Sequence, residues 1–374
     1  SNGHAGVETD QYKPFETRQR VYLGIDIGST STKAVLISEQ KDVLAGLYTQ
    51  TSGQPVKAMQ ALFEAIDTLA HRNACELVIQ GVGTTGSGRK FIGKIINADL
   101  IIDEITAHAR AAHELNPDTD TIIEIGGQDA KFTTMKNGMV TFSVMNNVCA
   151  AGTGSFIEEQ AIKLGVKLTD YAHRAMNTSA PISSDRCTVF MERDINNYLT
   201  EGYSVNEVLA SVLHSVCENY LAKVATEAAI GRYICFQGAT ARNRALVAAF
   251  EHRLKKPIFV SPYCHLTGAL GSALILLENV LRETGFRGLN LYREHIPVDN
   301  EVCQLCHNNC KINKVTVQGQ TVAFGFLCGR DYDTKHYVGK NKKQYDLLKE
   351  RSKLRTHAAA TLASKKAITF GIPN

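Results

Sequence analysis

Two stretches of the sequence decide the fold: "GIDIGSTSTKAVLI" at residues 24–37 and "IIEIGGQDAKFTTM" at residues 122–135. In each stretch an acidic residue follows an apolar run, Ile-Gly comes next, and a lysine lies seven positions after the acid. The two acid–lysine pairs are Asp26 with Lys33 and Glu124 with Lys131. The apolar runs and the small polar turns between them predict two strands joined by a tight turn in each copy.

Each copy is followed by a helical pattern and then by another strand. After the first copy, residues 55–72 have the periodicity of an amphipathic helix and residues 76–83 that of a strand. After the second copy, residues 205–229 predict a long helix and residues 233–238 a strand. This internal duplication predicts an α/β protein with two similar lobes and a cleft between them.

The change in sequence character along the chain predicts five segments. These are a tag and flexible lead-in (1–20), a first lobe (21–118), a second lobe (119–290) whose last helix (266–283) is placed to pack back on the first lobe, a Cys-rich metal-binding extension (291–334), and a linker helix toward a truncated next domain (335–374).

The composition excludes several classes of protein. The chain has 374 residues, 44% of them hydrophobic, and a net charge of only +4, so its charge gives no reason to expect nucleic acid or a membrane surface as a partner. No apolar run reaches the roughly 18 residues of a membrane span, and no signal peptide is recognisable. Ten cysteines without a secretion signal predict reduced thiols and a cytoplasmic location.

The glycine turns predict a nucleotide site. A glycine turn between strands leaves backbone N–H groups open to a phosphate, and an acid just before the turn can hold Mg²⁺ through water. Two such turns at matched spacing would grip a triphosphate from both sides, with Lys33 adding a positive charge. A third turn, "FQGATARNRAL" at residues 236–246, follows a strand and is placed to hold an adenosine. The sequence has no P-loop motif.

These residues carry a resemblance to a known family. The three turns resemble the phosphate-1, phosphate-2 and adenosine segments of actin-like (ribonuclease H-like) ATPases. Together with "EITAHARAA", "NNVCAAGTGSF", "CTVF" and "LTGALGSAL" they resemble the BadF/BadG/BcrA/BcrD ATPase family, over about residues 21–283. The chain departs from the family pattern at Glu124, where Asp is usual, and at Ala239, where a second glycine is common.

The resemblance implies a set of site residues. The residues expected to take part in catalysis are Asp26, Glu124 and Gln128. The residues expected to bind ATP are Gly28, Ser29, Thr30, Lys33, Gly126, Gly127, Asp129, Lys131, Gly238, Ala239, Arg242 and Gly268.

The resemblance also implies a role for two cysteines that each precede a helical stretch, Cys149 and Cys187. A [4Fe–4S] cluster needs four thiolates, and a two-fold dimer of activator lobes would supply two from each side. The implied function is an ATP-driven activator that passes a low-potential electron to a 2-hydroxyacyl-CoA dehydratase or benzoyl-CoA reductase component. The implied partners are a ferredoxin or flavodoxin as donor and a second activator lobe, in a homodimer or as a fused first module.

The C-terminal segment has its own cysteine set. Cys303, Cys306, Cys310 and Cys328 have spacings typical of four-thiolate sites, which bind Zn²⁺ or a second iron–sulfur cluster. This tail resembles the long fused family members, in which two activator modules precede dehydratase-like regions. By that resemblance the chain would be the second activator module.

Two other functions stay open on the sequence alone. One is a small-molecule (sugar or acid) kinase of the same superfamily, which would have no use for Cys149. The other is a nucleotide-sensing structural module without electron transfer. Iron content of protein purified without oxygen would discriminate the activator from both.

Overall fold

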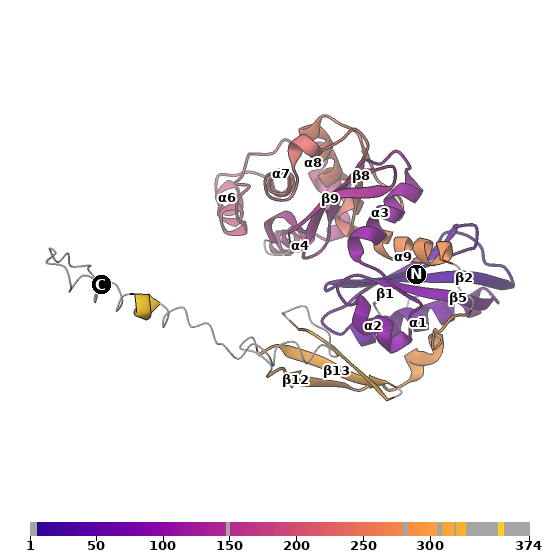
Figure 1. Cartoon of the computed structure of the whole chain (residues 1–374). Coiled ribbons are helices and arrows are strands. Elements are labelled where there is room, and N and C mark those ends of the chain that lie inside the picture. Colours follow the sequence, from indigo (N-terminus) through magenta and orange to yellow (C-terminus); the bar gives the residue numbers. More distant parts are fainter. Residues whose placement is uncertain are drawn as a thin grey trace. The chain divides into compact units, whose positions relative to one another are not determined.

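The computed structural model describes residues 6–146, 150–279, 283–304, 309–317, 319–326 and 351–354 (Figure 1). The chain divides into two compact units, Ser1–Ile296 and Pro297–Asn374. Cys149, Cys306 and Cys328 lie outside the described residues. In the part of the chain that is described, no helix is long and apolar enough to cross a membrane.

The first sheet holds the first copy of the motif. Among the described residues its six strands have the order β1-β4-β3-β2-β5-β6. They are β1 (Val7–Gln11), β2 (Arg18–Ile27), β3 (Ser31–Ile37), β4 (Val43–Gln50), β5 (Glu76–Thr85) and β6 (Leu100–Ile101). β2 and β5 are parallel, and α1 (Pro55–Arg72) connects β4 to β5 because a parallel neighbour requires a crossover. The short helix α2 (Arg89–Ile96) lies between β5 and β6 in the chain.

The second sheet repeats this topology. Its five strands within the described residues have the order β11-β10-β7-β8-β9. They are β7 (Thr121–Ile125), β8 (Ala130–Lys136), β9 (Met139–Asn146), β10 (Ile234–Gln237) and β11 (Ile258–Phe259). Asp26 is paired with Lys33 across β2 and β3, and Glu124 is paired with Lys131 across β7 and β8. The predicted duplicated two-lobe α/β fold is therefore confirmed.

The helices of the second lobe build its core. They are α4 (Gly154–Lys163), α5 (Leu168–Ala175), α6 (Thr188–Thr200), α7 (Val205–Lys223) and α8 (Arg244–Leu254), with short 3-10 turns η1 (Ala150–Gly152), η2 (Glu227–Ala229) and η3 (Ala239–Arg242). Apolar side chains of α7 are buried with Ile123 and Phe132 of the sheet. The long α7 is thus the central helix of this lobe (Figure 1).

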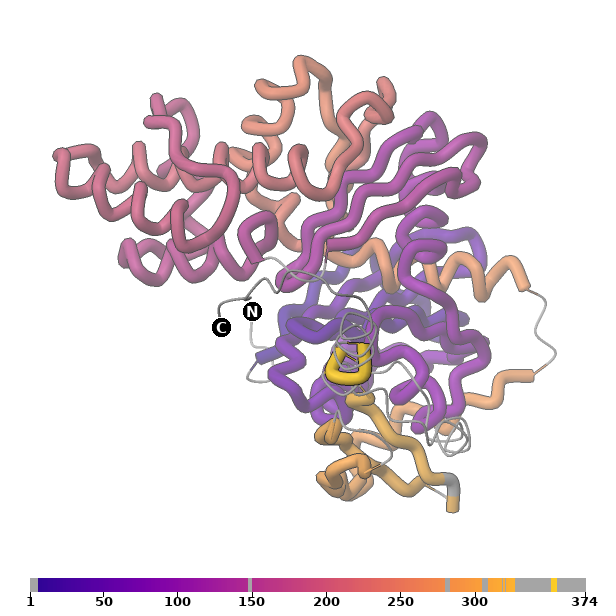
Figure 2. The backbone as a smooth tube through the Cα atoms, turned by 60° about the vertical axis from the view of Figure 1, so that its left-hand side comes forward, coloured from indigo at the N-terminus to yellow at the C-terminus, as the bar shows by residue number. Residues whose placement is uncertain are grey.

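Two helices cross between the lobes. α3 (Glu104–Leu115) follows the first sheet in the chain but buries Ala109 and Ala112 against Ile122 of the second sheet. α9 (Thr267–Glu278) follows the second sheet but packs on β2, β3 and β5 of the first, as Figures 1 and 2 show. A Cβ atom at Gly24 would collide with the Ala269 carbonyl, so glycine permits this close approach. α3 and α9 also contact each other, which places both helices where the lobes meet. A last turn, η4 (Leu289–Arg293), completes this unit.

The N-terminus differs from the expected flexible lead-in. Val7–Gln11 form β1, which pairs antiparallel with β4 and places Glu8 opposite Tyr48. Tyr12 then packs edge to face on Tyr263, with the ring centroids 4.8 Å apart. The run Val-Glu-Thr-Asp-Gln has a single apolar residue, so its strand conformation comes from pairing with β4 and not from a hydrophobic pattern of its own.

The C-terminal unit has a small antiparallel sheet of β12 (Val298–Val302), β13 (Lys311–Val317) and β14 (Gln320–Phe324). Cys303 and Cys310 are both buried, and the N–H of Cys303 donates to the carbonyl of Cys310 at 2.8 Å. The structure thus brings together two of the four predicted metal-binding cysteines. The full site remains a prediction, since the other two lie outside the described residues.

Candidate functional site

A cleft of about 770 Å³ lies between the two lobes, and both copies of the motif line it. The predicted site residues that line this cleft are Asp26, Gly28, Ser29, Thr30, Lys33, Glu124, Gly126, Gly127, Gln128, Asp129, Gly238, Ala239 and Arg242. Two other predicted ATP-binding residues, Lys131 and Gly268, lie behind this lining. Cys187 is partly exposed at the start of α6 and is not part of the lining.

The two glycine turns, at residues 28–31 and 126–129, have the same backbone hydrogen bond. The N–H of Gly28 donates to the Ser31 carbonyl at 3.0 Å, and the N–H of Gly126 donates to the Asp129 carbonyl at 2.9 Å. The turns also meet across the cleft, since a Cβ atom at Gly127 would lie only 2.7 Å from Oγ1 of Thr30. The two glycine turns therefore approach each other so closely that a side chain at residue 127 would collide with Thr30.

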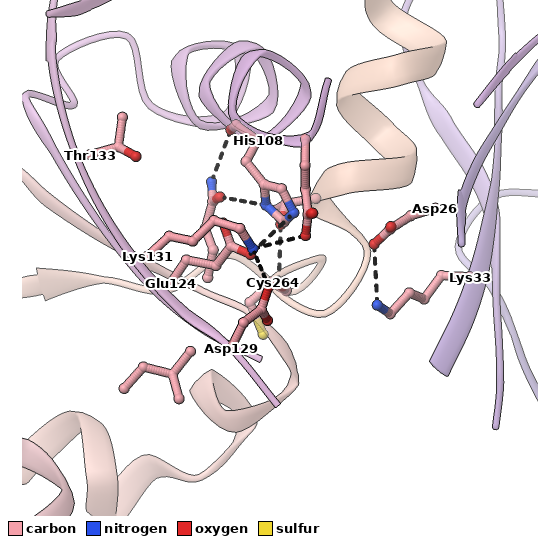
Figure 3. Close-up of polar contacts among 12 residues, drawn as sticks. Asp26, Lys33, His108, Glu124, Asp129, Lys131, Thr133 and Cys264 are labelled. Carbon is pink, nitrogen blue, oxygen red and sulfur yellow. Dashed lines mark hydrogen bonds and ion pairs between the residues drawn. The ribbon is translucent and has the colours of Figure 1, made fainter. Parts of the chain in front are cut away.

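On the first lobe, Asp26 forms an ion pair with Lys33 (Figure 3). The Lys33 Nζ lies 3.1 Å from Oδ2 of Asp26, and both side chains are largely buried. Burial raises the pKa of Asp26, but attraction to Lys33 and His108 outweighs it, so the pKa lies below its ordinary value. Oδ1 of Asp26 is buried and has no hydrogen-bond partner among the described residues. An ionised carboxylate with a free buried oxygen is suited to a cation or to cation-bound water.

On the second lobe, Lys131 neutralises a cluster of acids. Its ammonium group lies 2.8 Å from Oε1 of Glu104, 2.8 Å from Oε1 of Glu124 and 2.9 Å from Oδ2 of Asp129. Burial lowers the pKa of Lys131, but the attraction of these three carboxylates holds it well above its ordinary value. Lys131 is only 1% exposed, so it balances charge beneath the cleft.

His108 and Glu104 belong to this site, although the motif reasoning did not assign them. Both come from α3, four positions apart and therefore on one face of the helix. The His108 Nε2 lies 3.4 Å from Oε1 of Glu124, and its Nδ1 lies 3.1 Å from Oε1 of Gln237 and 3.0 Å from Oγ1 of Thr267. Figure 3 shows His108 directed toward Glu124 and Lys131. The signal was present in "EITAHARAA" as the spacing of an acid and a histidine.

Glu104, His108 and Glu124 form the one group of possible metal ligands found among the described residues, with ligand atoms within 4.8 Å of one another. The Lys131 ammonium already bridges the two carboxylates of that group. The largest effect on Glu104 is burial, which raises its pKa above the ordinary value against the attraction of Lys131. Lys131 therefore already occupies the space between these two carboxylates and offsets part of their charge, and Asp26 offers the better free oxygen.

At the far end of the cleft, β1 adds a residue that the sequence did not predict. The Arg242 guanidinium binds the Glu8 carboxylate with two hydrogen bonds of 2.7 and 3.2 Å, joining the lobes. These bonds lower the pKa of Glu8. Burial, and then repulsion by Arg242, lowers the pKa of the neighbouring His265 to about 4, so its imidazole is neutral at neutral pH.

The duplicated sheets and the polar cleft between them define a class of protein, the actin-like two-lobe ATPases. Residues 23–275 match the model of the BadF/BadG/BcrA/BcrD ATPase family, and the chain belongs to that family, as the motifs predicted.

Three relatives show the extent of the similarity. The activator of lactoyl-CoA dehydratase from Anaerotignum propionicum is 36% identical over 263 residues, which are 68% of this chain and 97% of that protein. Component A of the (R)-2-hydroxyglutaryl-CoA dehydratase from Acidaminococcus fermentans has a crystal structure that is 30% identical. It covers 70% of this chain and 98% of its own, with a TM-score of 0.62. The activator of the 2-hydroxyisocaproyl-CoA dehydratase from Clostridium difficile, solved with bound ADPNP, is 32% identical. The match covers 69% of this chain and 94% of that activator, with a TM-score of 0.59.

Proposed function

We propose that this protein hydrolyses MgATP in the interlobe cleft and uses the energy to inject a low-potential electron into a 2-hydroxyacyl-CoA dehydratase or a related reductase component. The observation that carries the proposal is the pair of glycine turns facing each other across the cleft, each preceded by an acid, in a family whose relatives activate such dehydratases.

The charge of the cleft supports a divalent cation. In the two ion-pair clusters beside the glycine turns, four carboxylates face two lysine ammonium groups, an excess of two negative charges among these six groups. The free Oδ1 of Asp26 fits a water ligand of Mg²⁺, and Glu124 faces it from the other lobe. Bound there, Mg²⁺ supplies charge neutralisation for the phosphates.

Other residues of the cleft would bind the phosphates, the attacking water and the adenosine. The N–H groups of Gly28 and Gly126 close the turns, so the phosphate oxygens are held by the N–H groups that follow them, those of residues 29–30 and 127–128. Lys33 adds a positive charge. Gln128 is exposed to the cleft, where its side-chain amide can orient the attacking water by hydrogen bonds. The turn at Gly238 and Ala239 holds the adenosine, with Arg242 beside it.

Cys187 fits a thiolate ligand. It is the N-cap residue of α6, is partly exposed, and lies next to the exposed side chains of Val189 and Phe190. The positive end of a helix favours a thiolate and an anionic group bound to it. A [4Fe–4S] cluster held by Cys149 and Cys187 of two activator lobes would supply one-electron storage.

The second phosphate turn is joined directly to the segment that follows Cys149. The N–H of Gly154 donates to the Gly126 carbonyl at 2.9 Å, and the N–H of Ser155 donates to the Gly127 carbonyl at 2.8 Å. The first residues of α4 therefore move with the phosphate turn. A nucleotide that binds one arrangement of the lobes more tightly than another would shift this turn and α4 together.

The proposal includes three partners. A reduced ferredoxin or flavodoxin is the electron donor, and a dehydratase or reductase component is the acceptor. The second activator lobe is another copy of this chain, or the first module of a longer fused protein of which this chain is the second.

The ATPase part is tested by Asp26→Asn, with Asp42→Asn as the matched control. Asp42 forms an ion pair of 2.6 Å with Lys13 on the surface of the same lobe. We expect Asp26→Asn to lower the turnover of MgATP by about a hundredfold, the usual scale for one lost electrostatic contact at a reacting centre. The control should keep its turnover, and both variants should keep the wild-type circular dichroism spectrum. Unchanged turnover in Asp26→Asn would exclude the assignment.

A further inference from the structure

The segment that precedes Cys187 is attached to the rest of the lobe mainly through side-chain hydrogen bonds. Residues 181–186, the Cys187 lead segment, form no helix or strand. The segment is held mainly by side chains. Tyr198 of α6 donates to the carbonyl of Ile182, and the N–H of Ser184 donates to Asp194 at 2.9 Å. The position of Cys187 therefore depends on a few side-chain hydrogen bonds.

Three of the residues that hold this segment lie on one face of α7. Ser211, Ser215 and Asn219 are spaced by four positions, and their side chains are at most 3% exposed. Ser211 Oγ donates to the Pro181 carbonyl at 2.8 Å, and the hydroxyl groups of Ser211 and Ser215 both bond that of Ser183. We call these three residues the α7 polar row.

Within this row, Asn219 bonds the residues that come directly before Cys187 in the chain. Its Nδ2 donates to the carbonyls of Asp185 and Arg186, the two residues before Cys187. Its Oδ1 is buried and has no hydrogen-bond partner among the described residues. A Cβ atom at Gly152 would lie 2.9 Å from that Oδ1, so η1 packs directly on the amide. One side chain thus contacts the lead segment and the turn that opens α4.

The next residue on α7 contacts β8, beneath the cleft. Tyr220 is fully buried, and its hydroxyl donates to the backbone carbonyl of Lys131 at 2.6 Å. Lys131 is the cation that bridges the acids of the second lobe. Asn219 and Tyr220 are therefore neighbours on one rigid helix, one bound to the Cys187 lead segment and the other to the strand that carries the cleft's charge balance.

From these contacts we propose that α7 positions Cys187 through Asn219 and connects it through Tyr220 to the strand beneath the proposed nucleotide cleft. The α7 polar row fixes the lead segment to the helix. Tyr220 makes the helix follow β8 when nucleotide binding changes the charges around Lys131. The connection to the cleft rests on the proposed nucleotide site, whereas the positioning of Cys187 by α7 does not.

The readout is the rate at which iodoacetamide alkylates Cys187 in the cluster-free full chain, resolved by mass spectrometry of the Cys187 peptide. Without nucleotide, Asn219→Leu should raise this rate about fivefold, because two backbone carbonyls lose their donor and the segment opens more often. With the non-hydrolysable analogue ADPNP and Mg²⁺, the wild-type rate should change about fivefold, the lower range of coupling between sites. Tyr220→Phe should keep the wild-type basal rate and lose the response to ADPNP.

Tyr171→Phe is the matched control, because the fully buried Tyr171 also donates to a backbone carbonyl, that of Leu209, at 3.1 Å. It should keep both the basal rate and the nucleotide response. Calorimetry measures ADPNP binding by each variant. If Asn219→Leu leaves the basal rate unchanged, the positioning role is wrong whatever the nucleotide result. If ADPNP binds to wild type and Tyr220→Phe responds as wild type does, the connection through α7 is wrong. If ADPNP does not bind to wild type, the proposed function fails and the connection to the cleft fails with it.

Discussion

Lys131→Met is the substitution whose effect on stability follows most directly from the structure. The Met side chain keeps most of the buried volume, so the main loss is the charge that binds Glu104, Glu124 and Asp129. Removing one partner from a buried ion-pair network costs about 3–5 kcal/mol, because the remaining charges stay buried without compensation. Glu104 and Asp129 are 24% and 30% exposed, so water screens part of this cost. We therefore expect a loss of about 3 kcal/mol in the free energy of unfolding.

The matched control is Lys163→Met. The Lys163 ammonium also pairs with two carboxylates, those of Glu159 at 2.9 Å and Glu192 at 2.6 Å, but it is 42% exposed. Exposed pairs contribute about 0–1 kcal/mol. Urea unfolding followed by circular dichroism compares the two variants with wild type. Equal destabilisation by the two substitutions would refute the reasoning, because burial would then have no part in the effect.

The pH dependence of the same variant has a definite sign. Burial already raises the pKa of Glu104 in the folded protein, and Lys131 opposes that rise. Without Lys131 the folded-state pKa rises further above the unfolded value, so the folded state binds protons more readily. Stability then increases as the pH falls through the folded-state pKa toward the unfolded one. The deficit of Lys131→Met against wild type should therefore be smaller at pH 5 than at pH 8, and a larger deficit at pH 5 would contradict this assignment.

Three further predictions concern the cleft and the tail. Glu8→Gln weakens the ion pair with Arg242 that joins the lobes, and should speed release of a fluorescent ADP by up to about fivefold in stopped flow; an unchanged rate would show that the pair does not restrain the cleft. Gly127→Ala places a methyl group against Thr30, and should lower MgATP turnover at least about tenfold with an unchanged unfolding midpoint; full turnover would mean that the turns need not approach. Cys303→Ser should lower the zinc or iron bound by the anaerobically purified chain, and metal content equal to wild type would contradict the predicted tail site.

The sequence was sufficient to predict the duplicated fold and many of the residues that line the cleft between the lobes. The acid–lysine pairs depend on a local turn of fixed length, which places Asp26 opposite Lys33 and Glu124 opposite Lys131. The spacing within a motif does not predict, however, how deeply each lysine side chain is buried. Lys131 and Lys33 have the same position in their two motifs. Lys131 is nevertheless only 1% exposed, and it pairs with Glu104, which comes from α3 and not from the motif.

Contacts between distant segments could not be predicted from the motifs. Glu8 comes from a strand with almost no apolar pattern, and His108 reaches the cleft because α3 crosses to the second lobe. The α7 polar row did leave a trace in the sequence, as small polar residues at every fourth position among the apolar residues of a long helix. That trace shows that the residues need partners, but only the fold shows that the partners belong to the segment before Cys187.

Electron paramagnetic resonance can detect whether Cys187 holds an iron–sulfur cluster shared between two activator lobes. The measurement uses dithionite-reduced protein reconstituted without oxygen, in the Cys303→Ser background so that the tail cysteines cannot supply a complete set. We expect about four irons for every two chains and a [4Fe–4S]⁺ signal. Adding Cys187→Ser should abolish that signal, because it removes two of the four ligands, while MgATP binding should persist. A full signal after Cys187→Ser would show that Cys187 is not a ligand of the cluster.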